Sequence, residues 1–295
     1  MTGTGRPRGA ARAFRRVPGS EWWRTEGSFF LLSEAHRSKL EGERARAFLE
    51  RVVALPPPAR VLDLACGWGR VAIPLAQRGH RVVAVDISPV LHLGRQLARA
   101  EAAPVDFVRA DLRRWEPCAQ FDLVLLWGMS FGYFREEENL RLLRRIRSWL
   151  KPQGVAVLDL HHPPWYRQHY VGEQVELTPG GVLHDEVRWD APGRRMQVMS
   201  TLADGEGRVR ARQFHDFREY SFEEIRRLAR RAGLRPRSLH GGLRPEEGPP
   251  RPDESSFQWV LERDRTGTAG GPQGVLPTSK RNRRNRRRPS RGSPR

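Results

Sequence analysis

Two carboxylates and two glycines at a regular spacing are the residues of this chain best suited to bind a ligand. Gly67 and Gly69 follow an apolar run that contains Asp63. A second apolar run ends in Asp86, 17 residues after Gly69. Glycine lets the backbone turn tightly and come close to a ligand, and an acid near this distance binds ribose hydroxyls in nucleotide-binding strand-turn-helix units. The pattern predicts a nucleotide or nucleoside site.

The position of Asp63 separates two kinds of ligand. The segment 67–72 also fits the G-x-G-x-x-G/A pattern of dinucleotide sites, but the charge of Asp63 would repel a pyrophosphate. A cationic amine or sulfonium suits this carboxylate better. A third predicted strand, Val105 to Leu112, ends in Asp111, which could accept a hydrogen bond from an adenine amino group; capping of the next helix is the alternative. An NAD-dependent dehydrogenase is therefore the weakest interpretation.

The order of these motifs resembles that of the class I S-adenosylmethionine (SAM)-dependent methyltransferases. Their pattern is D-x-A/G-x-G-x-G, an acid ending strand two and an acid after strand three. This chain departs from it with Ala65 at the first glycine position and the bulky Trp68 between the glycines. The resemblance covers about residues 22–263 and implies SAM as cofactor. The cofactor-binding residues that it implies are Asp63, Ala65, Gly67, Gly69, Asp86, Ile87, Asp111, Leu112 and Trp127.

The run SFGYF at 130–134 and the REY segment at 218–220 resemble a subgroup of bacterial small-molecule methyltransferases. Ligand sites of open α/β sheets lie at the carboxyl ends of the strands, so the residues after the fourth and fifth strands are expected to face the methyl group. The predicted substrate pocket consists of Met129, Ser130, Tyr133, Trp165 and Tyr166.

Catalysis need not involve a dedicated base. Methyl transfer from a sulfonium is an in-line displacement, and much of its rate can come from holding the nucleophile near the methyl carbon. If the acceptor is a hydroxyl, His161 or His162 is the candidate base, because a neutral imidazole titrates near working pH. Packing or orientation of the substrate is the alternative role for both histidines.

Apolar periodicity predicts the elements that position these residues. The expected fold class is α/β: a Rossmann-like, seven-stranded, mostly parallel sheet with an antiparallel edge strand and a β-hairpin insert. Ser221 and Glu224 have the spacing of a capping box at the start of a late helix. The strands are predicted at 61–64, 82–85, 105–112, 121–127, 155–160, 235–240 and 257–261.

Two segments are predicted to lie near the mouth of the pocket. Residues 171–217 alternate apolar and polar side chains around turn signals at 191–193 and 204–205, which is typical of hairpins and suits a substrate lid or a dimer surface. The aromatic residues of 22–30 are expected to cover the cofactor or to pack on the core. The segment 33–55 is predicted to be helical, with an apolar face made of Phe48, Leu49, Val52 and Val53.

Charge is concentrated at the two ends of the chain. Residues 1–20 hold five arginines, residues 280–295 hold nine basic residues, and neither segment holds an acid. Without these two segments the formal charge of +19 falls to +5. We predict a disordered basic tail at 1–20, a methyltransferase domain at 21–263 with its insert at 171–217, and a disordered Arg-rich tail at 264–295.

Several classes of protein are disfavoured by composition. Two isolated cysteines argue against a disulfide framework and against a zinc site, so no metal is expected. No apolar run approaches the length of a membrane span, and the arginine-bearing start has no hydrophobic segment of a secretory signal. The cytoplasm is the expected location.

The sequence thus predicts methyl transfer from SAM to a small-molecule acceptor, with a homodimer as one use of the insert. An RNA methyltransferase is the first alternative, in which the C-terminal arginines contact phosphates without sequence preference. Against it, these arginines are not interleaved with aromatic residues. A protein that binds SAM without turnover and docks nucleic acid through its tail is the second alternative.

Overall fold

The computed structural model describes residues 38–264, which lie within one compact unit that ends at Asp264. Predictions for residues 1–20, for the aromatic residues of 22–30 and for the tail from 265 onward lie outside the described residues. Among the described helices, none is long and apolar enough to cross a membrane.

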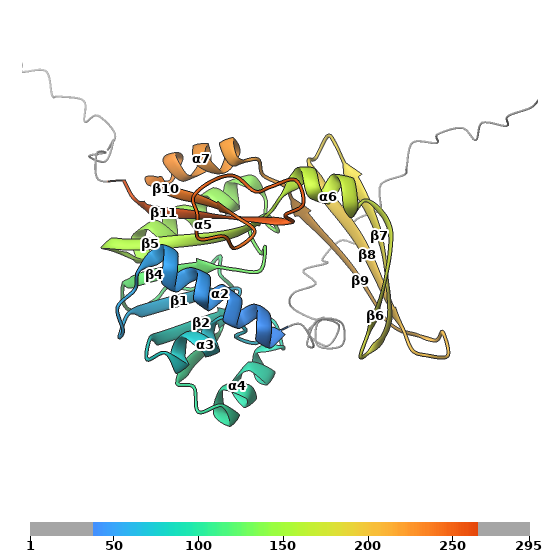
Figure 1. The fold of residues 1–295 in the computed structure, drawn as a ribbon, viewed down its shortest axis with the longest axis horizontal. Helices are drawn as coiled ribbons and strands as arrows, with labels where there is room; N and C mark the ends of the chain where they lie inside the picture. Colours follow the sequence, from blue (N-terminus) through green and yellow to red (C-terminus); the bar gives the residue numbers. More distant parts are fainter. Residues whose placement is uncertain (1–37, 265–295) are drawn as a thin grey trace, which may run out of the picture. The chain divides into compact units, whose positions relative to one another are not determined.

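A seven-stranded sheet forms the centre of this unit (Figure 1). Its strands are β1 (Arg60–Leu64), β2 (Arg81–Asp86), β3 (Val105–Arg109), β4 (Phe121–Leu126), β5 (Leu150–His161), β10 (Leu234–Gly241) and β11 (Ser256–Arg263). They are ordered β10-β11-β5-β4-β1-β2-β3. Strand β11 is antiparallel to both of its neighbours, so the antiparallel strand lies one place in from the edge. The predicted fold class is confirmed.

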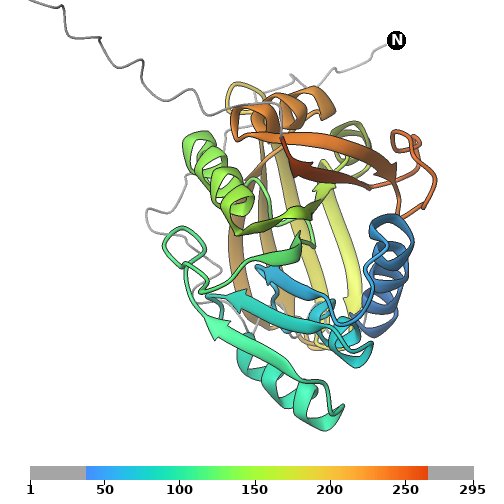
Figure 2. The same cartoon turned by 90° about the vertical axis from the view of Figure 1, so that its left-hand side faces the viewer.

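Helices cover both faces of this sheet (Figure 2). One face carries α2 (Ser38–Val53), α3 (Ala72–Gln77) and α4 (Leu91–Ala100), and the other carries α5 (Glu136–Trp149) and α7 (Phe222–Arg231). Side chains alternate between the faces because successive residues of a strand point to opposite sides. Val61 and Leu123 pack toward α2 and α3, whereas Leu62 and Val124 pack toward α5 and α7.

The predicted elements are present with shifted ends. The apolar face of α2 is as predicted, since Phe48, Leu49 and Val53 are buried. Strand β3 ends at Arg109, three residues before the predicted end, so Asp111 lies in the following turn. This turn bends back at once, because the N–H groups of Arg114 and Trp115 both donate to the carbonyl of Asp111.

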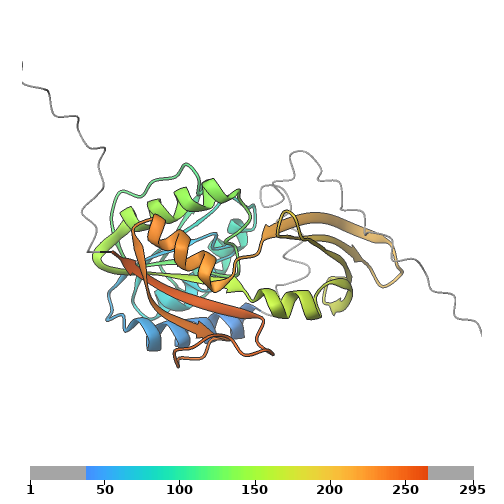
Figure 3. The same ribbon diagram turned by 90° about the horizontal axis from the view of Figure 1, so that it is seen from above.

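The predicted insert forms a four-stranded antiparallel sheet (Figure 3). A short helix, α6 (Pro163–His169), leads from β5 into it. At its base, the Arg218 N–H donates to the Gly132 carbonyl in the loop after β4, at 2.9 Å. The strands of this insert sheet are β6 (Gly172–Thr178), β7 (Gly181–Asp190), β8 (Arg195–Ala203) and β9 (Val209–Arg218).

The capping box at the start of α7 gives a direct test of local stability. Ser221 Oγ accepts from the Glu224 N–H, and Glu224 Oε2 accepts from the Ser221 N–H at 2.9 Å. We expect Ser221→Ala to lower the free energy of unfolding by about 1 kcal/mol, since it leaves a helix N–H without a partner. Ser221→Thr, which keeps the hydroxyl, should lose less. Equal loss in both variants, measured by urea unfolding, would contradict the capping role.

Candidate functional site

The turn between β1 and α3 has a backbone that only a few residue types adopt without strain. Ala65, Gly67 and Gly69 have φ angles of +52°, +57° and +84°. A Cβ added at Gly67 would meet no atom within 4 Å, whereas one at Gly69 would lie 2.7 Å from the Phe107 ring. Gly67 is therefore open to a ligand. Glycine is needed at position 69 for packing against Phe107. The sequence alone assigned both glycines to the close approach of a ligand.

Asp86 holds this turn in place. Its Oδ2 accepts from the Gly67 N–H at 2.8 Å, and its Oδ1 accepts from the Ser88 N–H at 2.7 Å. One carboxylate thereby joins the turn after β1 to the turn after β2. Burial raises the pKa of Asp86 above its usual value, although these N–H groups oppose the shift. Ile87, the next residue, is half-buried, and its carbonyl accepts from Arg109 Nε at 3.2 Å.

Asp63 lies under the same turn and is 2% exposed. Its Oδ1 is buried, and no hydrogen-bond partner for this atom exists within residues 38–264. Burial, and then the negative charge of Asp86, raise the pKa of Asp63 from 3.8 to about 7, although the Arg70 cation opposes them. A cation brought to this oxygen would favour the ionised form of Asp63.

The predicted adenine contact has a partner within the protein. The Asp111 carboxylate receives the Arg113 N–H at 2.9 Å and the Arg113 guanidinium at 2.7 Å. Residues 112–114 form a turn and, in the described part of the chain, no helix follows β3 before β4, so Asp111 does not cap a helix, which was the alternative, and its role toward adenine stays a prediction. Leu112 is buried, and its carbonyl accepts from Arg145 Nη1 at 2.7 Å.

The carboxyl end of β4 brings several predicted residues together. The Trp127 ring packs toward Phe48 of α2, with the ring centroids 6.0 Å apart, so Trp127 lies in the core. Ser130 Oγ donates to the Trp127 carbonyl at 3.3 Å. Met129 has a φ of +59°, an uncommon conformation for a residue with a side chain. Its sulfur receives the Tyr166 hydroxyl at 3.5 Å.

Two charged residues of the site were not predicted. Asp159 Oδ2 accepts from the Gly128 N–H at 3.0 Å, and its Oδ1 accepts from Gln258 Nε2 at 2.9 Å. Arg70 pairs with Glu41 at 2.7 Å, and its Nη2 would lie 2.8 Å from a Cβ on Gly128. The signal for Asp159 was present, because an acid within an apolar strand is the same feature that singled out Asp63.

His161 and Tyr166 form an aromatic cluster with the insert sheet. The His161 ring stacks on Phe217 at 4.0 Å and meets Tyr166 edge-on at 4.4 Å. Burial lowers the pKa of His161 to about 3, and within the described part of the chain its Nδ1 has no hydrogen-bond partner. Tyr133 packs on the same sheet, and burial, together with the charge of Asp86, raises its pKa.

His162 lies in different surroundings from His161. Its Nδ1 is 2.8 Å from the Glu254 carbonyl oxygen, and its ring stacks on Phe222 with the centroids 6.1 Å apart. Trp165 stacks on His169 at 5.0 Å and meets Tyr166 edge-on. Of the two histidines, His161 contacts Tyr166, a predicted pocket residue, whereas His162 packs on Phe222.

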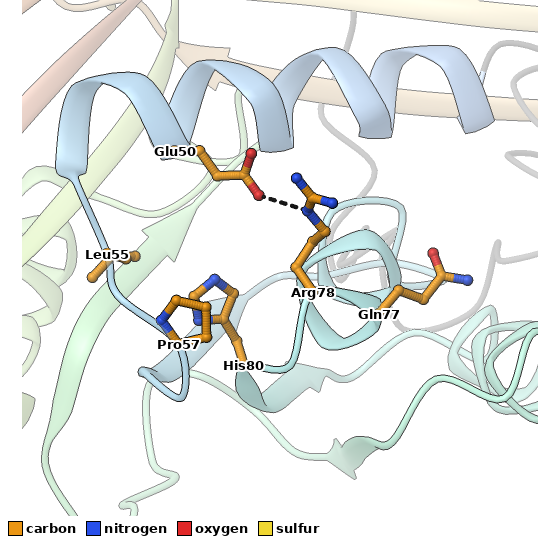
Figure 4. Close-up of a pocket in the computed structure, with 6 residues that line it drawn as sticks. All are labelled: Glu50, Leu55, Pro57, Gln77, Arg78 and His80. Atoms are coloured by element: carbon orange, nitrogen blue, oxygen red, sulfur yellow. Dashed lines mark hydrogen bonds and ion pairs between the residues drawn. The ribbon is translucent and has the colours of Figure 1, made fainter.

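A surface hollow elsewhere on the unit is lined by residues of α2, of α3 and of the loops that precede β1 and β2 (Figure 4). Its lining includes Glu50, Arg78 and His80. Because His80 and Pro57 precede β2 and β1, the hollow is at the amino ends of these strands, opposite the glycine turn. Ligands of open α/β sheets bind at the carboxyl ends, so this hollow is not the candidate site.

Comparison with known proteins identifies the relatives of this chain. A family model described as "Methyltransferase domain" matches residues 61–154. The cypemycin N-terminal methyltransferase of Streptomyces sp. is 34% identical over 187 residues, which cover 61% of this chain and 74% of that protein. The trans-aconitate 2-methyltransferase of Escherichia coli is 31% identical over 176 residues, which cover 58% of each chain.

Solved structures agree with this match in fold. The CcbJ methyltransferase from Streptomyces caelestis superposes with a TM-score of 0.66 at 23% identity, covering 76% of this chain and 89% of that one. Two other curated bacterial relatives are matched over 44% and 48% of their own length, so this chain spans about half of those proteins.

Because burial raises the pKa of Asp63, we expect Asp63→Asn to increase the free energy of unfolding of the protein without ligand. Because the folded-state pKa of Asp63 is about 7 and its ordinary value is 3.8, the stabilising contribution of the protonated carboxyl is complete below pH 3.8 and is lost as the pH rises through about 7. We expect Asp63→Asn to exceed the wild type by about 2–4 kcal/mol in unfolding free energy at pH 8. The difference should vanish near pH 4.

The matched control for this prediction is Asp106→Asn, which changes an exposed acid on β3, an edge strand of the same sheet. It should change stability little at either pH. Equal stability of the wild type and Asp63→Asn at pH 8, measured by denaturant unfolding, would contradict the buried charge.

The low pKa of His161 predicts loss of stability in acid. Its folded-state pKa of about 3 is below its ordinary value of 6.5, so the stabilising contribution of the neutral ring is present above pH 6.5 and is lost as the pH falls toward 3. His161→Phe keeps an aromatic ring against Phe217 and cannot titrate. Its unfolding free energy should fall less than that of the wild type between pH 6.5 and 4, by about 1.4 kcal/mol per pH unit at most.

The exposed His92 on α4 provides the control. His92→Gln should follow the wild-type dependence on pH. If His161→Phe also follows it, His161 is not held neutral by burial.

Proposed function

Because this chain belongs to the class I SAM-dependent methyltransferases, we propose that it transfers the methyl group of SAM to a small-molecule acceptor by in-line displacement. The observation that carries this proposal is the buried Asp63 oxygen without a partner in the described unit, beside a turn that is open at Gly67. A cationic ligand with a nucleoside part matches both features.

The fit to SAM follows from the chemistry of the residues at this turn. The free oxygen of Asp63 suits the amine or sulfonium of the ligand, and the space at Gly67 lets the ligand approach the backbone. Asp86 can bind the ribose hydroxyls while it holds the Gly67 N–H, since an ionised carboxylate accepts several hydrogen bonds. Structures of relatives in complex with SAM or S-adenosylhomocysteine support this assignment.

Bound SAM supplies an electrophilic methyl group on a sulfonium. The protein orients the acceptor through Met129, Tyr133 and Tyr166. The first two residues lie in the loop after β4, and Tyr166 lies on α6, which leads into the insert sheet. A pKa of about 3 makes His161 a weak base, so it cannot readily take the proton of a hydroxyl. This favours an acceptor that attacks as a neutral amine, with His161 as a positioning residue.

Two relatives are named for acceptors of modest size, the N-terminus of cypemycin and trans-aconitate. These names support a small molecule or a short peptide end as the acceptor of this chain. The RNA alternative depends on the Arg-rich tail, which lies outside the described residues, and no feature of residues 38–264 favours it. A homodimer stays a prediction.

The first test is a thermal-shift comparison of SAM, S-adenosylhomocysteine and NAD on the full chain. A ligand at about a hundred times its dissociation constant adds about 2.7 kcal/mol to the stability of the folded state. We expect the melting temperature to rise with the two SAM-type ligands and not with NAD. A shift with NAD alone would move the chain to another class of enzyme.

Gly67→Ala tests whether the open turn receives the cofactor. The added methyl meets no protein atom within 4 Å, so it occupies ligand space, and we expect SAM affinity to fall at least tenfold in calorimetric titration. The positive φ costs about 1–2 kcal/mol for a residue with a Cβ, and the fold should survive, because Ala65 has a similar φ. Ala65→Gly, which adds no atom, should keep its affinity. Unchanged binding by Gly67→Ala would remove the cofactor from this turn.

A further inference from the structure

A row of polar side chains crosses the insert sheet between the apolar row Leu183, Leu202 and Ala211 and the row Val187, Val198 and His215. The register places Asp185 on β7 opposite Ser200 on β8, and Ser200 opposite Gln213 on β9. These residues are only 8%, 2% and 3% exposed. Burying a polar side chain costs free energy unless the side chain is hydrogen-bonded. We therefore ask which hydrogen-bond partners the polar atoms of this row have.

This row is on the face of the insert sheet that packs toward the candidate site. Tyr133 and Tyr166 pack against the apolar cluster on this face, which includes Val187, Val198 and Phe217. Because side chains two residues apart share a face, Asp185 lies on the same side as Val187, and Gln213 lies on the same side as Phe217. Figure 3 shows α6 leading from the end of β5 to this sheet.

Three polar atoms of the row have no hydrogen-bond partner in the described part of the chain: Asp185 Oδ1 and both side-chain polar atoms of Gln213. The other oxygen of Asp185 receives the Tyr170 hydroxyl at 2.8 Å. Gln174, next to Asp185 in the same row on β6, differs, since its Nε2 donates to the carbonyls of His169 and Tyr170. Along this row from β6 to β9, Asp185 is thus the first described residue with a buried side-chain polar atom that lacks a hydrogen-bond partner.

The mixture of donors and acceptors selects the chemistry of the partner. Asp185 Oδ1 and Gln213 Oε1 need donors, and Gln213 Nε2 needs an acceptor. Hydroxyl groups both donate and accept, so they satisfy all three atoms. An ammonium would leave Gln213 Nε2 without an acceptor, and a carboxylate would be repelled by Asp185.

The distance along β9 fixes which part of a ligand reaches this row. Gln213 is four residues from Phe217, which is about 13 Å in an extended strand, and Phe217 stacks on His161. We propose that Asp185, Ser200 and Gln213 form a subsite for the hydroxyl groups of a polyhydroxylated ring, at the end of the acceptor remote from the methylated atom. This inference rests on the proposed function, because it extends the acceptor site.

Binding of ring fragments to the full chain with S-adenosylhomocysteine present tests this subsite. The probes are methyl glucoside and methyl rhamnoside, with cyclohexanol as a ring of one hydroxyl, titrated by saturation-transfer NMR. We expect at least one sugar to bind with the millimolar affinity typical of a few hydrogen bonds, and cyclohexanol to bind at least tenfold more weakly. Asp185→Asn and Gln213→Leu should each weaken the sugar at least tenfold.

Glu186→Gln is the matched control, because it removes one charge from the opposite face of the same strand. It should leave sugar affinity unchanged. All three variants should bind S-adenosylhomocysteine as the wild type does, which separates this inference from the proposed function. Failure of the wild type to bind either sugar, or equal binding by Asp185→Asn, would overturn the subsite and leave ordered water as the partner. Failure to bind S-adenosylhomocysteine would instead contradict the proposed function.

Discussion

The carboxylate of Asp86 is the interaction on which the candidate site depends. It accepts the Gly67 N–H and the Ser88 N–H, so the turns after β1 and β2 are fixed relative to each other. Asp86 is the side chain of β2 that holds the left-handed backbone around Gly67 in place by a hydrogen bond. The carboxylate is itself buried, and its hydrogen bonds offset the cost of that burial.

Features set by neighbouring residues were predictable from the sequence. The capping box of Ser221 and Glu224, the strand that ends in Asp86 and the apolar face of α2 each follow from residues a few positions apart. Contacts between distant segments were not predictable. Gln258 reaches Asp159 across 99 residues, and the need for glycine at position 69 arises from the Phe107 ring on β3.

The insert shows the same division. Its turn signals and the alternation of apolar and polar side chains predicted hairpins. The alignment of Asp185, Ser200 and Gln213 depends on cross-strand register, which turn residues alone do not specify over three strands. Asp111 is a further case, because its ion pair with Arg113 two residues away was not predicted from the sequence.

A cationic ligand bound beside the buried Asp63 would couple ligand exchange to the pH of the solution. With a pKa of about 7, this carboxyl is close to half-protonated in neutral solution, and a cation seated beside it would expel the remaining proton. Arrival of such a ligand would therefore release a fraction of a proton to the buffer. The heat measured for that event would change with the ionisation enthalpy of the buffer, and departure of the ligand would take the proton back.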